Sequence, residues 1–224
     1  VSGGTLVLAS GASLAGSVTN NAVFTNAGTV ANGVINNGTL VSTGSLNGSL
    51  VNNAGATASL SGAFSGNLIN RGTVNLTGTT IGIGELSLAT GAVFNLGGFA
   101  TTIGNLTGGG GTVALGSGTL TLGSGTGSQT FDGMITGSGG LTKVSASTFS
   151  LSGAQGYTGL TTVNGGTLIL GSNASLAGGV LNNARFTNAG RVSGLVTNIA
   201  TLESTGALNA GLVNATGASA RIRG

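Results

Sequence analysis

The chain has 224 residues, of which only nine are charged: six Lys or Arg and three Asp or Glu. It contains 47 Gly and no Pro, Cys, His or Trp, so disulfides, thiolate nucleophiles and histidine bases or ligands are all excluded. Hydrophobic residues make up 39% of the chain, which argues against intrinsic disorder. No apolar run reaches the roughly 18 residues of a membrane-spanning helix and no secretory signal pattern is visible, so we expect no direct insertion of this segment into a membrane.

The beginning of the chain is repeated at its end. Placing Val163 on Val1 aligns residues 1–62 with residues 163–224 without a gap, and 38 of these 62 positions are identical. The long repeat that starts at Val1 thus starts again at Val163, and both ends of the chain fall inside the repeated unit. We expect residues 1–224 to be one continuous fragment of a longer repetitive protein, with no internal domain boundary.

A shorter period runs through the first copy. Asn pairs or Asn-Arg recur in nearly equal steps, at 20–21, 36–37, 52–53 and 70–71. Between them, segments such as Thr5–Leu8 alternate polar and apolar residues as half-buried strands do, and the frequent Gly opposes helix. Such a period is close to one coil of a parallel β-solenoid, in which like residues stack and Asn side chains hydrogen-bond between coils. With about 16 to 20 residues per coil, the sequence predicts an all-β solenoid of roughly 11 to 14 coils.

An antiparallel sandwich is the alternative fold. Asn-Gly steps such as Asn32-Gly33 and Asn37-Gly38 favour the two-residue turns of β-hairpins. The absence of Pro favours the solenoid, because nearly every backbone N–H is needed for pairing between coils.

Large apolar residues are the candidates for the core. We expect the seven Phe to form a buried stack rather than an exposed ligand-binding stripe. Phe131 and Phe149 are separated by one short period, so both should point inward from adjacent coils. Leu168 should also point inward from its alternating segment. Tyr157 lies among Gly residues, so we expect it at a turn with its hydroxyl exposed.

One stretch carries a family likeness. Residues 137–171 read GSGGLTKVSASTFSLSGAQGYTGLTTVNGGTLILG. Through the elements GGLTK, LSG, YTG, TTVN and GTL, this stretch resembles the autotransporter-associated β-strand repeat, and residues 1–9 repeat its tail. It departs from the pattern where Ser145-Ala146-Ser147 replaces a Gly-x-Gly turn and where Leu160 stands in place of Gly.

The resemblance implies a right-handed, single-stranded parallel β-helix from the passenger region of a Gram-negative autotransporter. Such a passenger is extracellular, either held at the cell surface through an outer-membrane region outside this fragment or secreted. In that family the repeat is associated with secretion and folding of the passenger, not with a reaction. We therefore expect a structural stalk segment that templates its own folding coil by coil, with neighbouring coils of the same polypeptide as its partners.

The few charged residues favour a structural role over catalysis. Glu85, Asp132 and Glu203 are separated by roughly three and four coils along the chain, which is too far for a catalytic carboxylate pair. We expect no enzyme activity, no catalytic residue, no metal site and no cofactor. Lys143 is expected to be solvated beside a strand, so neutralising it together with Glu85 and Asp132 should leave the fold intact.

The two long copies differ wherever charge appears. Five neutral residues of the first copy are replaced by Arg185, Arg191, Glu203, Arg221 and Arg223 in the second, so no charged site is duplicated. The basic residues are too scattered to predict a nucleic-acid partner. Two other functions remain open: an adhesin module that binds host or cell-surface ligands, and a subunit that self-associates into filaments through its end coils.

Overall fold

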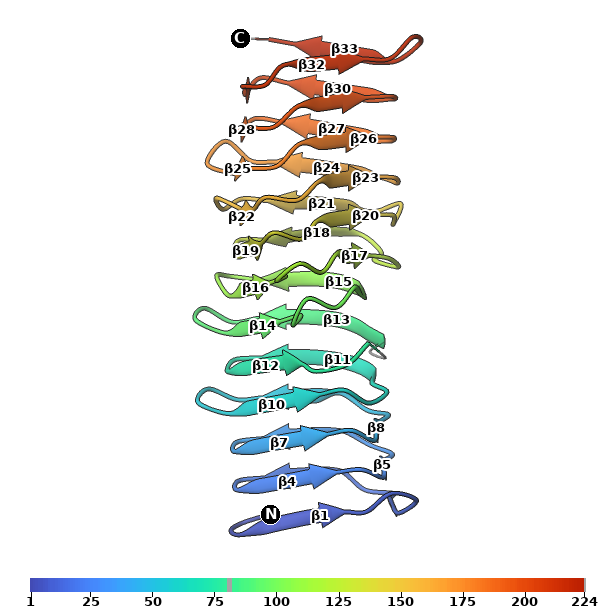
Figure 1. Ribbon diagram of the computed structural model, residues 1–224, viewed down its shortest axis with the longest axis vertical. Coiled ribbons are helices and arrows are strands. Elements are labelled where there is room, and N and C mark those ends of the chain that lie inside the picture. The colour runs from blue at the N-terminus through green and yellow to red at the C-terminus, as the bar shows by residue number, and fades with distance from the viewer. Residues whose placement is uncertain (80–81, 224) are drawn as a thin grey trace.

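The computed structural model describes residues 1–79 and 82–223. The chain winds into a stack of coils along one axis, with its two termini at opposite ends of the stack (Figure 1). The described residues contain no helix, and their paired strands run parallel. The predicted all-β parallel β-helix is therefore confirmed, and the sandwich alternative is wrong, because hairpins would require antiparallel pairs.

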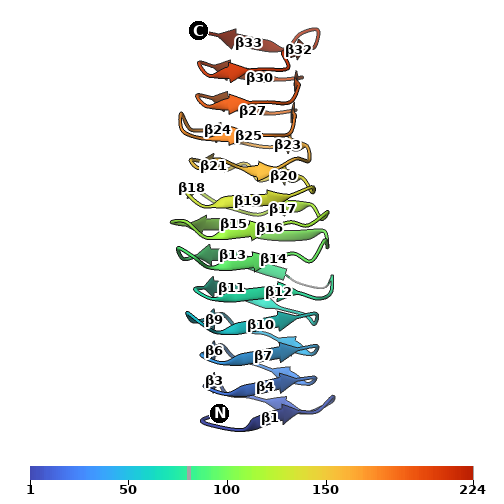
Figure 2. The ribbon, with the colours of Figure 1, turned by 60° about the vertical axis from the view of Figure 1, so that its left-hand side comes forward.

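Each coil contributes strand segments to three columns, which we call faces 1, 2 and 3, and Figure 2 shows several of these strands stacked along the rod. Face 1 is built from β1 (Thr5–Leu8), β4 (Val23–Asn26), β7 (Thr39–Ser42), β10 (Thr57–Leu60), β12 (Thr73–Leu76), β14 (Val93–Asn95), β16 (Thr112–Ala114), β19 (Met134–Gly137) and β22 (Gly156–Tyr157). A bridge between Ala154 and Ser175 continues face 1 to β25 (Ser175–Leu176), β28 (Arg191–Val192) and β31 (Ala207–Leu208).

Face 2 starts with short strands and continues with three-residue strands. It begins with β2 (Ser13–Leu14), β5 (Thr29–Val30) and β8 (Ser45–Leu46), and Phe64 of the following coil forms a bridge to Leu46. In the next three coils, face 2 is formed by the first residues of three longer strands that continue into face 3. Face 2 then continues through β17 (Leu120–Leu122), β20 (Leu141–Lys143), β23 (Thr161–Val163), β26 (Val180–Asn182), β29 (Val196–Asn198) and β32 (Leu212–Asn214).

Face 3 includes three long strands, β11 (Ser65–Asn70), β13 (Gly82–Leu88) and β15 (Thr101–Gly108), each of which passes from face 2 to face 3. Its members are β3 (Val18–Asn20), β6 (Val34–Asn36), β9 (Leu50–Asn52), β11 (Ser65–Asn70), β13 (Gly82–Leu88), β15 (Thr101–Gly108), β18 (Ser128–Phe131), β21 (Thr148–Leu151), β24 (Thr167–Leu170), β27 (Arg185–Asn188), β30 (Thr201–Ser204) and β33 (Ser219–Ile222). Counted on this face, the described residues form twelve coils, within the predicted range.

Coil length varies more than the Asn spacing predicts. Val18 pairs with Val34 in the next coil, whereas Val113 pairs with Ile135, so the later coil is six residues longer. Some of the variation comes from two-residue extensions at corners. Gly11, Gly55 and Gly91 each have φ of 79°, which a type II turn requires at its third residue and which Gly adopts without strain. The extra residues project at the corner, so the strands on either side keep their register.

Inward residues of the three faces form one continuous core. Along most strands buried residues alternate with more exposed ones, as period-two patterning predicts. Leu168 is fully buried, as predicted. Six of the seven Phe are buried as well, at Phe24, Phe64, Phe94, Phe131, Phe149 and Phe186.

Phe131 and Phe149 lie in adjacent coils and both point inward, as predicted. They do not stack on each other, because the local coil is two residues longer than their spacing. Phe149 is paired with Gln129, and Phe131 is paired with Leu151. The expected Phe stack is therefore replaced by rings alternating with aliphatic or amide side chains.

The two copies of the long repeat lie on different faces of the rod. Thr5–Leu8 forms β1 on face 1 of the first coil, whereas its counterpart Thr167–Leu170 forms β24 on face 3 of the ninth coil. Likewise, β3 lies on face 3 and its counterpart β26 lies on face 2. One long repeat therefore spans eight full coils and two of the three faces of a further coil. Because it stops one face short of a whole number of coils, the second copy is rotated by one face about the rod axis.

Leu168→Asp should destabilise the rod by about 3–5 kcal/mol, because it places an unpaired carboxylate in the core between Phe149 and Phe186. Ile169→Asp is the matched control, since Ile169 is the next residue of β24 and lies on its outer side, where we expect a loss of at most about 1 kcal/mol. Urea unfolding of both variants measures the difference. Equal losses would contradict the assigned inner and outer sides.

Candidate functional site

A column of buried Asn side chains runs along one corner of the N-terminal coils. The Nδ2 atom of Asn20 donates to Oδ1 of Asn36, Asn36 donates to Asn52, and Asn52 donates to Asn70, at 2.8, 2.8 and 2.9 Å. All four residues are fully buried. Each Nδ2 also donates to a backbone carbonyl of the following coil, at 2.7–3.0 Å. The predicted Asn ladder is therefore confirmed, and it satisfies polar groups that would be costly to bury alone.

The second copy builds a second ladder at a different corner. Asn182 donates to Asn198, and Asn198 donates to Asn214, both at 2.7 Å. This ladder ends the strands of face 2, whereas the first ladder ends the strands of face 3. The same sequence therefore gives the same contacts on a rotated part of the rod.

An outer ladder accompanies the first buried one. Asn37 donates to Asn21 at 2.6 Å, and the guanidinium of Arg71 donates to Oδ1 of Asn53 at 3.1 Å. These side chains are exposed, so water can replace their partners.

Lys143 is fully buried, so the expectation that it is solvated is wrong. Its Nζ donates to the carbonyl of Ser145 at 2.6 Å, to Oγ of Ser145 at 3.2 Å and to the carbonyl of Gly165 at 2.9 Å. The alternation of β20 places Leu141 and Lys143 on the same inner side, and this signal was present in the sequence. Lys143 thus fills a corner of face 2 that Asn182 fills two coils later.

The ammonium group belongs to a short buried network. Ser145 and Ser147 share a hydrogen bond of 2.9 Å between their Oγ atoms, and Ser147 donates to Oε1 of Gln129 at 3.4 Å. Ser145 and Ser147 are therefore partners in the chain of contacts that ends at Lys143. Burial lowers the pKa of Lys143, and no ion pair to it occurs among residues 1–79 and 82–223.

Tyr157 is also fully buried, so the predicted exposed hydroxyl is wrong. Its hydroxyl hydrogen-bonds Oγ1 of Thr161 at 2.6 Å. Burial raises the pKa of Tyr157 above its usual value, because the phenolate would lose its hydration.

The carboxylates are dispersed, but less widely than the sequence spacing suggests. Glu85 lies on β13 of the fifth coil and Asp132 follows β18 of the seventh, so two coils separate them rather than three, because the intervening coils are long. The register also sets them four residues apart along the strands, which adds roughly 13 Å to about 10 Å along the axis. Thr107 donates to Glu85 at 3.2 Å and Ser152 donates to Asp132, so each has a hydroxyl partner of its own.

Within the described ranges, no three His, Cys, Asp or Glu residues come close enough to hold a metal ion. Glu85 borders a pocket of about 180 Å³ lined by Asn67, Leu68, Ile69, Glu85 and Ser87. None of these neighbours is a second acid or a base, so the pocket lacks the paired groups of acid–base catalysis.

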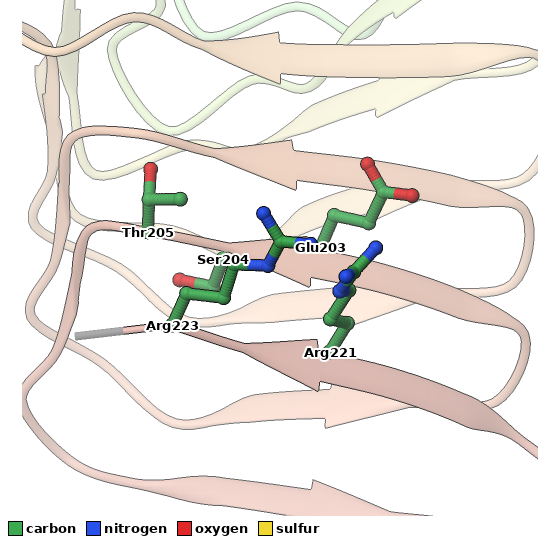
Figure 3. A pocket seen from close by; sticks show the side chains of 5 residues that line it. All are labelled: Glu203, Ser204, Thr205, Arg221 and Arg223. Carbon is green, nitrogen blue, oxygen red and sulfur yellow. The ribbon is translucent and has the colours of Figure 1, made fainter.

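The densest group of charges lies near the C-terminal end of face 3. Arg185 forms an ion pair of 2.9 Å with Glu203, and Glu203 is the register partner of Arg221 in the next coil. Arg221 and Arg223 extend from β33 and its end toward β30, where they border a pocket of about 110 Å³ with Glu203, Ser204 and Thr205 (Figure 3). These charges replace neutral residues of the first copy, but their proximity could not be predicted from the sequence, because it depends on the pairing of β27, β30 and β33.

Comparison with models of protein families, with curated proteins and with solved structures gave no match for this chain. The part of the chain that the structure describes has no helix long and apolar enough to cross a membrane.

Asn36→Ala should lower the free energy of unfolding by about 2–3 kcal/mol, because one buried N–H of Asn20 loses its acceptor and the buried Oδ1 of Asn52 loses its donor. Asn37→Ala removes the exposed neighbour and should change the free energy of unfolding by less than about 0.5 kcal/mol. Chemical denaturation of the two variants makes the comparison. A larger loss for Asn37→Ala would show that the buried ladder does not stabilise the fold.

Lys143→Met should cost about 1–3 kcal/mol at neutral pH, because the carbonyls of Ser145 and Gly165 lose a buried donor. Neutralising Glu85 and Asp132 together as Gln and Asn should cost less than about 0.5 kcal/mol per site, since both are at least partly exposed. Thermal and urea unfolding of the two variants test this difference. If Lys143→Met were as stable as the double variant, the buried contacts of the ammonium would contribute nothing.

Proposed function

We propose that this chain is a structural stalk segment of an extracellular bacterial surface protein, in the passenger region of an autotransporter. The observation that carries the proposal is the unbroken stack of parallel coils through the described residues, with one continuous core and dispersed reactive groups. Such a stack extends along one axis by about 4.8 Å for each coil, which suits a spacer better than a catalyst.

The stack also supplies a physical mechanism for folding during export. Each coil ends in a row of unpaired N–H and C=O groups that the next coil must satisfy, so a folded coil is a template for its neighbour. The buried Asn ladders add side-chain contacts between coils to this backbone template. Folding can then proceed coil by coil without an external energy source.

The environment of the 137–171 motif supports a role in folding rather than in a reaction. Lys143 and Tyr157, its two most distinctive side chains, are both enclosed in the core and hydrogen-bonded there. Residues that touch substrate would have to be reachable from outside. The motif therefore acts in the interior of the coil, as expected of a repeat associated with passenger folding.

Deletion of residues 21–52 tests the stalk role. It removes two of the short N-terminal coils and joins Asn20 to Asn53, so Asn20 takes the place of Asn52 in the register. We expect this variant to fold as a rod that is shorter by about 10 Å in solution scattering. When the chain is displayed between an outer-membrane barrel and a terminal epitope, the epitope should remain on the cell surface and the rod should resist protease.

Deletion of residues 21–44 is the matched control, because it removes fewer residues but joins face 3 directly to β8 of face 2. This out-of-register variant should lose protease resistance and surface display. The stalk proposal is contradicted if the in-register deletion folds normally yet abolishes display, or if both deletions behave alike.

A further inference from the structure

Four of the nine charged residues of the sequence gather on three consecutive strands of face 3. Arg185 lies on β27, Glu203 on β30 and Arg221 on β33, and Arg223 follows β33. We call these four residues the Arg surface. Its three Arg residues are exposed and Glu203 is half-buried, so the group faces solvent.

The internal ion pair does not neutralise the Arg surface. Glu203 contacts Arg185 at 2.9 Å and lies opposite Arg221, so one carboxylate is shared by a group with three guanidinium ions. Arg221 and Arg223 meet the pocket of about 110 Å³ from the same side (Figure 3). Two positive charges remain available to an external anion, with Thr205 beside them, whereas the hydroxyl of Ser204 is buried and bonded to Asn188 and Gly206.

The fold itself does not require these charges. The first copy carries Val23, Val41, Ser59 and Ser61 at the corresponding positions and forms the same kind of parallel stack. Moreover, the preceding outward residues of face 3, Ser150 and Ile169, are neutral. These four charges therefore form one outer patch that the first copy lacks.

We propose that the Arg surface binds the sulfate or phosphate ester groups of a polysaccharide. A guanidinium presents several N–H donors in a planar fork that matches tetrahedral oxyanions, and it stays charged at any physiological pH. Arg185 on β27 and the pair Arg221 and Arg223 at β33 lie two coils, or about 10 Å, apart along the rod, so a polymer that carries many such groups contacts both at once. The shallow pocket admits one oxyanion group rather than a whole sugar ring.

A dextran series provides the test, because dextran sulfate, phosphorylated dextran, carboxymethyl dextran and neutral dextran share one backbone. Binding of the full chain to each is measured by surface plasmon resonance at several salt concentrations. We expect binding to the sulfate and phosphate forms, weaker binding to the carboxymethyl form and none to neutral dextran. The ratio of the first two distinguishes a sulfated from a phosphorylated ligand.

Two double variants distinguish binding by the Arg surface from binding caused by the overall positive charge of the chain. The double variant Arg221→Gln/Arg223→Gln and the control Arg71→Gln/Arg191→Gln both lower the net charge from +3 to +1. The first should weaken binding at least about tenfold, whereas the control should change it less than about twofold. Glu203→Gln should strengthen binding, because it removes the one negative charge of the Arg surface.

The proposal is overturned if the two double variants lose affinity equally, if neutral dextran binds as well as dextran sulfate, or if an oligonucleotide binds more tightly than both dextran sulfate and phosphorylated dextran. Circular dichroism of each variant checks that the rod is intact. The result is independent of the stalk role, because coil deletion and surface display test that role without an anionic ligand.

Discussion

Parallel backbone pairing between successive coils is the constraint on which the rest of this structure depends. Each coil must place its N–H and C=O groups opposite those of its neighbours, so each side chain lies directly over its counterpart. Additional residues are tolerated where they do not disturb this register, as at the corner turns that contain Gly11 and Gly55. The inner side of each strand therefore accepts few residue types, whereas the corners accept additional residues.

The polar interior is a consequence of the same constraint. At the corners the chain turns away from the sheet, and backbone carbonyls there need donors that the parallel ladder cannot supply. Asn side chains supply those donors and accept from each other, whereas Lys143 and Gln155 make similar corner contacts singly. These contacts form only when the coils are in register. A slipped pairing would leave buried amide groups without hydrogen-bond partners and would therefore be less stable.

The sequence was sufficient to predict the coil, the parallel stacking and the Asn ladder, since all three follow from periodicity. It was insufficient where coil length changed: Phe131 and Phe149 reach adjacent coils but not one stack, because the local coil is longer than the distance between them in the sequence. Lys143 lies inside, contrary to its charge, because it alternates with Leu141 along β20, and Tyr157 lies inside although the Gly residues around it predict an exposed turn. The Arg surface could not be predicted, since it depends on which strands of the second copy are neighbours.

The one-face rotation between the two copies has a consequence for how a longer protein would present its surface. If the same long repeat continued further, equivalent side chains would follow a threefold screw, each set about 42 Å beyond the last and on the next face of the rod. Three units would complete twenty-six coils before a feature returned to its starting side. A patch such as the Arg surface, if repeated, would then be offered to the surroundings in every direction, so a rod that cannot turn about its own axis could still be approached from any side.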